Sequence, residues 1–235
     1  MLPERLDQVR QRIRAACQRC GRSPSSVTLI GVTKGVPAER IHQALTLGLT
    51  DLGENRVQEA REKRARLGAA ARWHLIGHLQ RNKARHAVEL FDLIHSVDDA
   101  ELTDELERQA AEQGRRLEVL IQVNISGEAR KSGCPPEAAE VLARRIQRAP
   151  ALVWRGLMTM APFAEDPEAA RPVFRRLRQL RDQLQERLGG PLQLSMGMSQ
   201  DFEVAIEEGA DWVRVGTAIF GARGGEQEIG EARHG

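Results

Sequence analysis

The sequence predicts a protein of the α/β class: a single (β/α)8 barrel of the TIM type with an additional N-terminal helix. Short β-branched or apolar runs alternate with longer amphipathic stretches, which is typical of repeated βα units around a parallel sheet. Eight such runs follow one another, and no segment rich in proline, glycine or serine separates them as a linker would. The count of eight favours a closed barrel over the alternative, an open doubly wound sheet.

The eight predicted strands cover residues 27–33, 50–53, 73–77, 93–97, 117–124, 153–158, 192–196 and 212–215. The amphipathic stretches between them predict helices over residues 38–47, 57–67, 82–90, 99–113, 136–147, 168–188 and 199–208. Several of these stretches are followed by glycine, the residue that helix C-termini favour. The additional helix is expected over residues 3–20. The barrel domain should extend over residues 1–223, and residues 224–235 should form a loose polar tail.

Composition excludes several classes of function. The chain has 235 residues, with 35 Lys and Arg against 33 Asp and Glu, which gives a formal net charge of +2. Such a balance provides no large field of one sign, so no nucleic-acid partner is expected. No window reaches the roughly 18 apolar residues of a membrane helix, and the N-terminus lacks the pattern of a secretory signal. We therefore expect a cytoplasmic protein without a membrane partner.

The cysteines and histidines do not predict a metal site. Cys17, Cys20 and Cys134 are an odd number, and the Cys17–Cys20 pair has no second pair or histidine cluster to complete a zinc site. His74 and His78 are four residues apart, which suits a metal only on a helix, whereas the pattern around them predicts a strand. On that strand the two imidazoles would share one face, with His78 near the mouth of the barrel. We expect reduced thiols and no metal.

Residues suited to chemistry stand at the predicted strand ends, which meet on one face of a barrel. Asn55, His78 and Met158 stand at the ends of the second, third and sixth strands. Lys34 directly follows the apolar run 27–33, so its amine should face the mouth. Partial burial or a nearby cation would lower the pKa of such an amine and let it attack an aldehyde. The alternative is a strand-end lysine that reaches into solvent.

The loops after strands seven and eight of a barrel often bind phosphate. In this chain they offer hydroxyl donors and glycines that allow close backbone approach, namely Ser195, Gly197, Ser199, Gly216 and Thr217. Each is an ordinary turn residue by itself. Together with Lys34, they describe a site that holds a phosphorylated aldehyde at both ends.

Arg214 precedes Gly216 by two residues, so strand alternation turns both residues to the same side. Its guanidinium would then lie inside the barrel and donate to the nitrogen of a pyridine ring. That donation keeps the nitrogen unprotonated and makes the ring a weaker electron sink. The alternative is a salt bridge to a neighbouring acid such as Asp211.

The chain resembles the YggS/PROSC family of pyridoxal phosphate homeostasis proteins, whose barrel is related to the N-terminal domain of alanine racemase. The resemblance extends from about residue 27 to residue 223, and the order of the matching segments makes it specific. These segments are residues 32–37 (VTKGVP), 53–59 (GENRVQE), 74–83 (HLIGHLQRNK), 156–160 (GLMTM), 195–199 (SMGMS) and 213–223 (VRVGTAIFGAR). Thr33 replaces a common serine, and Arg56 replaces a frequent aromatic residue.

The resemblance implies that pyridoxal 5'-phosphate is bound as a Schiff base on Lys34. It implies that Arg214 faces the pyridine nitrogen and that Asn55 lies near the ring. It makes His78 a residue behind the immediate pocket. The full candidate set for cofactor binding is Lys34, Asn55, His78, Met158, Ser195, Ser199, Arg214, Gly216 and Thr217.

The expected function is intracellular homeostasis of pyridoxal phosphate, by buffering the cofactor or delivering it to dependent apoenzymes, with little or no turnover. A racemase of the alanine type needs a lysine and a tyrosine on opposite faces of its substrate, and the tyrosine comes from a second domain. This chain has no tyrosine and no room for that domain, so we also expect a monomer. The alternatives are a pyridoxal phosphate-dependent amino-acid racemase of low activity, a Schiff-base aldolase, and an interaction module without cofactor.

Overall fold

Eight parallel strands close into a barrel in the order of the sequence, which confirms the predicted fold class. The structure is a computed structural model, and it describes residues 1–68, 70–128 and 132–221. Each strand begins and ends within two residues of its predicted position. The strands are β1 (Thr28–Val32), β2 (Asp51–Glu54), β3 (Arg72–Leu75), β4 (Leu93–Val97), β5 (Leu117–Gln122), β6 (Leu152–Met158), β7 (Gln193–Ser195) and β8 (Trp212–Val215).

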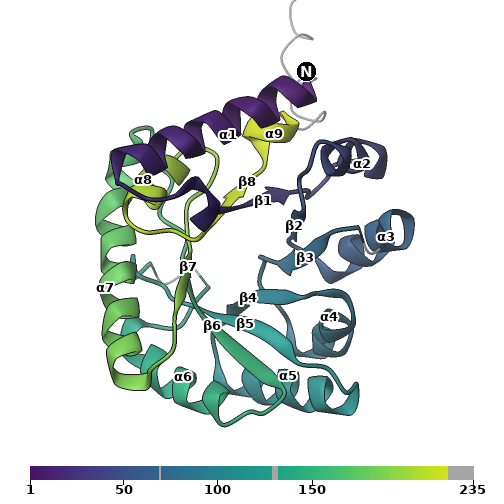
Figure 1. The fold of residues 1–235 in the computed structure, drawn as a ribbon. Coiled ribbons are helices and arrows are strands. Elements are labelled where there is room, and N and C mark those ends of the chain that lie inside the picture. The colour runs from purple at the N-terminus through teal and green to yellow at the C-terminus, as the bar shows by residue number, and fades with distance from the viewer. Residues whose placement is uncertain (69, 129–131, 222–235) are drawn as a thin grey trace, which may run out of the picture.

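Helices surround the barrel as an outer layer (Figure 1). They are α2 (Ala38–Thr46), α3 (Val57–Leu67), α4 (Ala84–Leu90), α5 (Ala100–Glu112), α6 (Ala139–Gln147), α7 (Arg171–Leu188), α8 (Phe202–Glu207) and α9 (Thr217–Phe220). Three predicted helices begin instead as short 3-10 turns, namely η2 (Arg81–Lys83), η3 (Pro136–Ala138) and η4 (Pro167–Ala170). The four-residue α9 is not predicted from the sequence. No helix in the described parts of the chain is long and apolar enough to span a membrane, and the predicted tail lies outside them.

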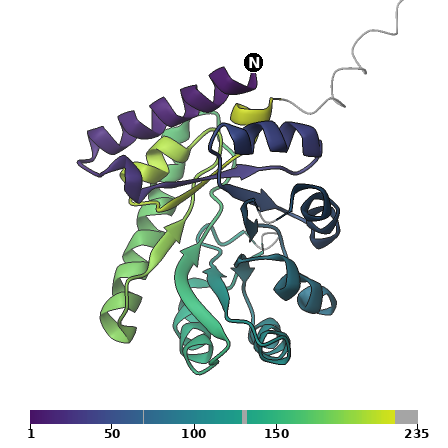
Figure 2. The same cartoon turned by 45° about the vertical axis from the view of Figure 1, so that its right-hand side comes forward.

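The additional N-terminal helix, α1 (Leu2–Arg19), covers the seam where the last strand meets the first. Its buried residues recur every three or four positions and form one apolar face, comprising Leu2, Leu6, Val9, Ile13, Ala16 and Cys17. This face packs against α8 and α9, and Figure 2 shows α1, in purple, outside the ring of strands. α1 therefore packs on the two helices that precede and follow β8, the strand that carries Arg214.

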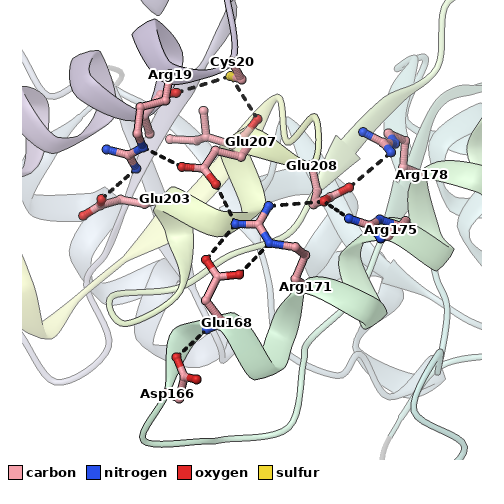
Figure 3. A network of polar contacts seen from close by, with 12 residues as sticks. Arg19, Cys20, Asp166, Glu168, Arg171, Arg175, Arg178, Glu203, Glu207 and Glu208 are labelled. Carbon is pink, nitrogen blue, oxygen red and sulfur yellow. Dashed lines mark hydrogen bonds and ion pairs between the residues drawn. The ribbon is translucent and has the colours of Figure 1, made fainter.

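Ion pairs fix α8 between its two helical neighbours (Figure 3). Arg19 of α1 donates to Glu203 and to Glu207 of α8 at 3.0 and 2.7 Å. Arg171 of α7 donates to the same Glu207 at 2.6 Å and to Glu208 at 3.2 Å. Such a network contributes more than isolated surface pairs do, because each charge has several partners. It holds α8, and with it the preceding loop after β7, in place.

The interior of the barrel contains a small apolar core separate from the larger core beneath the helices. Five side chains from β1, β4, β5, β6 and β8 form it, namely Ile30, Leu93, Leu120, Met158 and Trp212. Since these strands lie around the whole ring, their side chains meet only by pointing inward. The rest of the interior is polar, and its residues bear directly on the candidate site.

Candidate functional site

A cavity of about 370 Å³ lies at the C-terminal end of the barrel, a volume that suits a small ligand. Its walls come from the end of β1 and from the loops after β6, β7 and β8. Five of the predicted site residues line this Lys34 cavity, namely Lys34, Ser199, Arg214, Gly216 and Thr217. The structure thus brings together residues that are separated by up to 183 positions, as expected for strand ends of a barrel.

Lys34 lies two residues after the end of β1 and is half-buried. Within the described residues its amine has no hydrogen bond or ion pair, so it is available to a ligand in the cavity. The backbone on either side of it is held in place. The carbonyl of Thr33 accepts from Lys63 Nζ at 2.5 Å, and the N–H of Gly35 donates to Glu59 Oε1 at 2.6 Å.

Lys63 is a buried cation that ties this backbone to β2 and α3. Its amine donates to Thr33 O, to Glu54 Oε1 at 2.7 Å and to Glu59 Oε1 at 2.6 Å, so all three hydrogens are used. Glu54 has no exposed surface and also accepts from the Thr33 hydroxyl at 2.5 Å. The role of Lys63 is not predicted from the sequence. The available signal is the spacing of four between Glu59 and Lys63 on one helix face.

The two carboxylates of this cluster differ in pKa. Burial raises the pKa of Glu54, and the hydrogen bonds from Lys63 and Thr33 offset this only in part. Burial also pushes the pKa of Glu59 upward, but the hydrogen bonds from Lys63 and Gly35 outweigh it and lower the pKa. The positive charge of Lys63 therefore compensates the negative charges of Glu54 and Glu59 behind the Lys34 cavity.

The loop after β7 supplies one wall of the cavity. The helix that follows this loop begins later than predicted. The N–H of Met198 donates to Asp201 Oδ1 at 2.6 Å, which turns the chain before α8 starts at Phe202. Ser199 therefore remains in the loop rather than at a helix start. Its hydroxyl oxygen accepts from the Gly216 N–H at 3.2 Å and joins the two predicted phosphate loops.

The hydrogen-bond donors of these two loops belong to residues that line the same cavity. The Ser199 hydroxyl hydrogen has no acceptor within the described residues. Gly216 precedes α9, whose first N–H groups, as in any helix, lack an acceptor in the helix itself. Thr217 adds a hydroxyl at the same place. The donor set fits an anion such as a phosphate group.

Arg214 lies inside the barrel and is only 3% exposed, as strand alternation predicts. Its Nη1 donates to Ser195 Oγ at 2.6 Å and its Nη2 to Thr159 O at 2.9 Å. The alternative of a salt bridge to Asp211 is wrong, because Asp211 pairs with Arg22 at 3.2 Å. Burial lowers the pKa of Arg214 to about 10, with partial compensation by Asp201, so the guanidinium stays charged at neutral pH.

Two predicted ligands, Ser195 and Met158, lie below the cavity rather than on its wall. Both have no exposed surface. Ser195 is the last residue of β7 and turns into the interior, where it contacts Arg214 and His95. Met158 belongs to the interior apolar core. Both residues end a strand on its inward side, and neither is among the residues that line the cavity.

Asn55 and His78 line a different cavity, of about 380 Å³, together with Arg56, Arg61 and Lys83. The prediction that His78 shares a strand face with His74 is wrong, because β3 ends at Leu75. His74 is fully buried in the interior, whereas His78 is exposed in the following loop. Within the part of the chain that the structure describes, no group of three or more metal-ligating side chains is arranged to hold an ion.

Comparisons with known proteins agree with this geometry. The family model of the alanine racemase N-terminal domain matches residues 5–224. A pyridoxal phosphate homeostasis protein of Aquifex aeolicus is 46% identical over 222 residues, which cover 94% of this chain and 97% of that protein.

Solved structures show the same barrel. PipY of Synechococcus elongatus, with pyridoxal phosphate bound, superposes with a TM-score of 0.83 at 39% identity, covering 94% of this chain and all of PipY. An alanine racemase of Clostridium difficile matches with a TM-score of 0.75 at 15% identity, covering 96% of this chain and 57% of the racemase, which shows the fold alone. The chain therefore belongs to the family of pyridoxal phosphate homeostasis proteins, as its motifs predict, and its barrel is that of the alanine racemase N-terminal domain.

Proposed function

We propose that this chain binds pyridoxal 5'-phosphate in the Lys34 cavity as a Schiff base on Lys34. Its role is cofactor homeostasis, by buffering or delivery to dependent apoenzymes, with little or no turnover. The observation that carries the proposal is that one cavity combines a free amine, a buried guanidinium and the donors of two adjoining loops. The names of the relatives and the PipY complex support it.

The residues of the cavity suit the three functional groups of the cofactor. Lys34, as the free base, adds to the aldehyde carbon, and a C=N bond forms while the carbonyl oxygen leaves as water. Ser199 and Thr217 donate to the phosphate through their hydroxyls, and Gly216, whose N–H donates to Ser199, lets the phosphate approach the backbone. Arg214 donates to the pyridine nitrogen through N–H groups that neither Ser195 nor Thr159 uses. The bound cofactor supplies an electron sink, which Arg214 weakens because a guanidinium does not give up its proton to the ring.

The surroundings of Lys34 favour a carrier over an enzyme. Racemisation or aldol cleavage needs a second proton-transfer group opposite the lysine. The acids lining the cavity are Asp166 and Asp201, and each accepts a hydrogen bond from a backbone N–H, of Glu168 at 2.9 Å and of Met198 at 2.6 Å. The sequence contains no tyrosine to take that role. The racemase and aldolase alternatives therefore have less support than the carrier.

The remaining candidates are proposed to act indirectly. Ser195 acts through its hydrogen bond to Arg214, and Met158 fills the interior beneath the cavity. Asn55 and His78 line the other cavity and contribute to its shape rather than holding the phosphate.

Borohydride reduction followed by peptide mass mapping tests the attachment. The reduced chain should carry one pyridoxyl group on the peptide containing Lys34, and Lys34→Ala should remain colourless with pyridoxal phosphate. Lys83→Ala is the matched control, because Lys83 is exposed and lines the other cavity. A label on another residue, or no label, would refute the proposal.

Activity and transfer assays test the carrier role. Amino-acid racemisation and sugar-phosphate cleavage should stay at background with the loaded protein. An apoenzyme that requires pyridoxal phosphate should regain activity when mixed with it. Rapid turnover that depends on Lys34 would instead establish an enzyme.

A further inference from the structure

A continuous chain of buried polar side chains crosses the interior of the barrel beneath the Lys34 cavity. Asp51 Oδ1 lies 2.9 Å from His74 Nε2, and His74 Nδ1 lies 2.9 Å from His95 Nε2. His95 Nδ1 lies 2.9 Å from Ser195 Oγ, which accepts from Arg214 Nη1 at 2.6 Å. All five residues are at most 8% exposed. Each comes from a different strand, and the contact between His95 of β4 and Ser195 of β7 spans the barrel.

We call the series Asp51, His74, His95, Ser195 and Arg214 the polar relay. Its two end residues lie at opposite ends of the barrel. Arg214 lines the Lys34 cavity at the C-terminal end. Asp51 is the first residue of β2 and lines a cavity of about 800 Å³ among the first residues of the strands, with Arg72 and Glu118. The relay therefore connects the lower mouth of the barrel to the candidate cofactor site.

The end groups allow only one direction of hydrogen bonding. A guanidinium has no acceptor atom, so Arg214 can only donate to Ser195. Because Asp51 accepts from His74 and each neutral ring has one donor and one acceptor nitrogen, His95 Nδ1 is an acceptor and the Ser195 hydroxyl gives its hydrogen to it. His95 in turn donates through Nε2 to His74 Nδ1, and His74 donates through Nε2 to Asp51. Asp51 ends the relay as an ionised carboxylate, which can only accept.

The electrostatics of the relay agree with this direction. Burial lowers the pKa of His74, although Asp51 opposes the shift, and burial lowers the pKa of His95 well below its ordinary value. Both rings are therefore neutral, with one donor and one acceptor nitrogen each. Burial pushes the pKa of Asp51 upward, but the hydrogen bonds from His74 and Thr50 outweigh it and lower the pKa.

We propose that Asp51, His74, His95 and Ser195 are positioning residues that fix the orientation of Arg214 from the opposite end of the barrel. The relay gives Ser195 a single hydroxyl orientation, with its lone pair directed at Arg214 and its hydrogen directed away. Without the fixed acceptor at Asp51, the tautomers of both histidines become free to invert and Ser195 is no longer held as an acceptor. The effect on a ligand rests on the proposed function, because Arg214 is assigned there to the pyridine nitrogen.

Nitrogen NMR of histidine-labelled protein without cofactor tests the direction of the relay. Signals missing in His74→Gln and His95→Gln assign the two rings among the six histidines. Each ring should be neutral and protonated at Nε2 at neutral pH. A charged ring, or a proton on Nδ1 of either ring, would overturn the proposal. This result does not depend on cofactor binding.

Titration with pyridoxal phosphate, followed by absorbance, tests the effect on Arg214. Ser195→Ala removes one small link, and we expect roughly tenfold weaker binding and a shifted absorption band of the bound cofactor, as for a lost charge-assisted hydrogen bond. Ser96→Ala is the matched control, because Ser96 is equally buried on β4 and its hydroxyl has no hydrogen-bond partner within the described residues. It should bind and absorb like the wild type.

A second pair of variants tests action from a distance. Asp51→Leu removes the final acceptor and should shift the same absorption band, whereas Glu118→Gln removes one charge from the same lower cavity and should not. Wild-type affinity and absorbance in both Ser195→Ala and Asp51→Leu would refute the positioning role. If the wild-type chain itself bound no pyridoxal phosphate, the proposed function would fail, and the NMR result would still decide the relay.

Discussion

Replacement of Lys63 should destabilise the protein by more than any surface lysine can. In Lys63→Met, the Glu54 carboxylate loses its cation while it remains without exposed surface, and Glu59 and the Thr33 carbonyl lose their shared donor. Removing one partner of a buried ion pair costs about 3–5 kcal/mol, because the other charge stays buried and unpaired. We expect the free energy of unfolding, measured with urea at pH 7.5, to fall by this amount.

The pH dependence of the stability difference between Lys63→Met and the wild type has a predictable direction. The pKa of Glu54 is already raised in the folded chain, and a carboxyl with a raised folded pKa loses stability as pH rises through that value. Loss of Lys63 raises this pKa further. At low pH Glu54 is protonated in both proteins, so the difference between variant and wild type should shrink as the pH falls from 7.5. A difference that grows on acidification would contradict the reasoning.

Two controls separate the effect of the unpaired Glu54 charge from the general effect of replacing a lysine side chain. Glu54→Gln in the Lys63→Met background removes the buried charge and keeps an acceptor for the Thr33 hydroxyl, so the loss should fall to about 1–2 kcal/mol. Lys83→Met removes an exposed lysine and should change stability by less than about 0.5 kcal/mol. A loss below about 1 kcal/mol in Lys63→Met would refute the assignment of Lys63 as a buried counter-charge.

Two further substitutions test the surroundings of the cavity. Gly197→Ala should weaken pyridoxal phosphate binding at least tenfold by titration and lower stability by about 1–3 kcal/mol, because φ is +90° there and a Cβ would lie 2.5 Å from the Ala205 side chain and 2.9 Å from Phe202 Cα. Glu208→Gln should lower the free energy of unfolding by about 1–2 kcal/mol in urea, because its side chain, 5% exposed, pairs with three partly exposed arginines of α7. Unchanged binding or stability would contradict either prediction.

The strands were predictable because their signals are local. β4 and β8 coincide with the apolar runs 93–97 and 212–215, and a run of that kind is read from consecutive residues alone. The position of Lys34 directly after such a run was enough to place it at the mouth. The same reasoning placed Ser199, Gly216 and Thr217 there, because strand C-termini meet whatever the details of packing.

The direction in which a strand-end residue points was harder to predict. Ser195 and Ser199 belong to the same segment, yet Ser195 turns inward at the end of β7 while Ser199 lies in the loop at the cavity. The first depends on register and barrel closure, and the second on a turn that Asp201 makes with Met198. Lys63 was missed for a related reason, because its partners Thr33 and Glu54 lie on other elements and only Glu59 is a helical neighbour.

The polar relay could not be predicted from the sequence, because its contacts form only when the barrel closes. Its central contact joins His95 and Ser195, which are 100 residues apart on strands that do not pair. No helical or strand periodicity brings such residues together. Histidines in apolar runs indicate burial but not partners, so His74 was weighed only against a metal site and His95 was not noticed.

The relay also implies that its two charges stabilise the fold jointly. Asp51 and Arg214 would each be costly if buried alone, and the neutral groups between them give each charge a hydrogen-bond partner. Substitutions at residues without shared partners normally add within about 0.5 kcal/mol. Asp51→Leu and Arg214→Met should instead couple by at least about 1 kcal/mol in a double-mutant cycle of urea unfolding, since the loss of either end already disrupts the same hydrogen bonds. Additive losses would mean that the two charges are stabilised independently of each other.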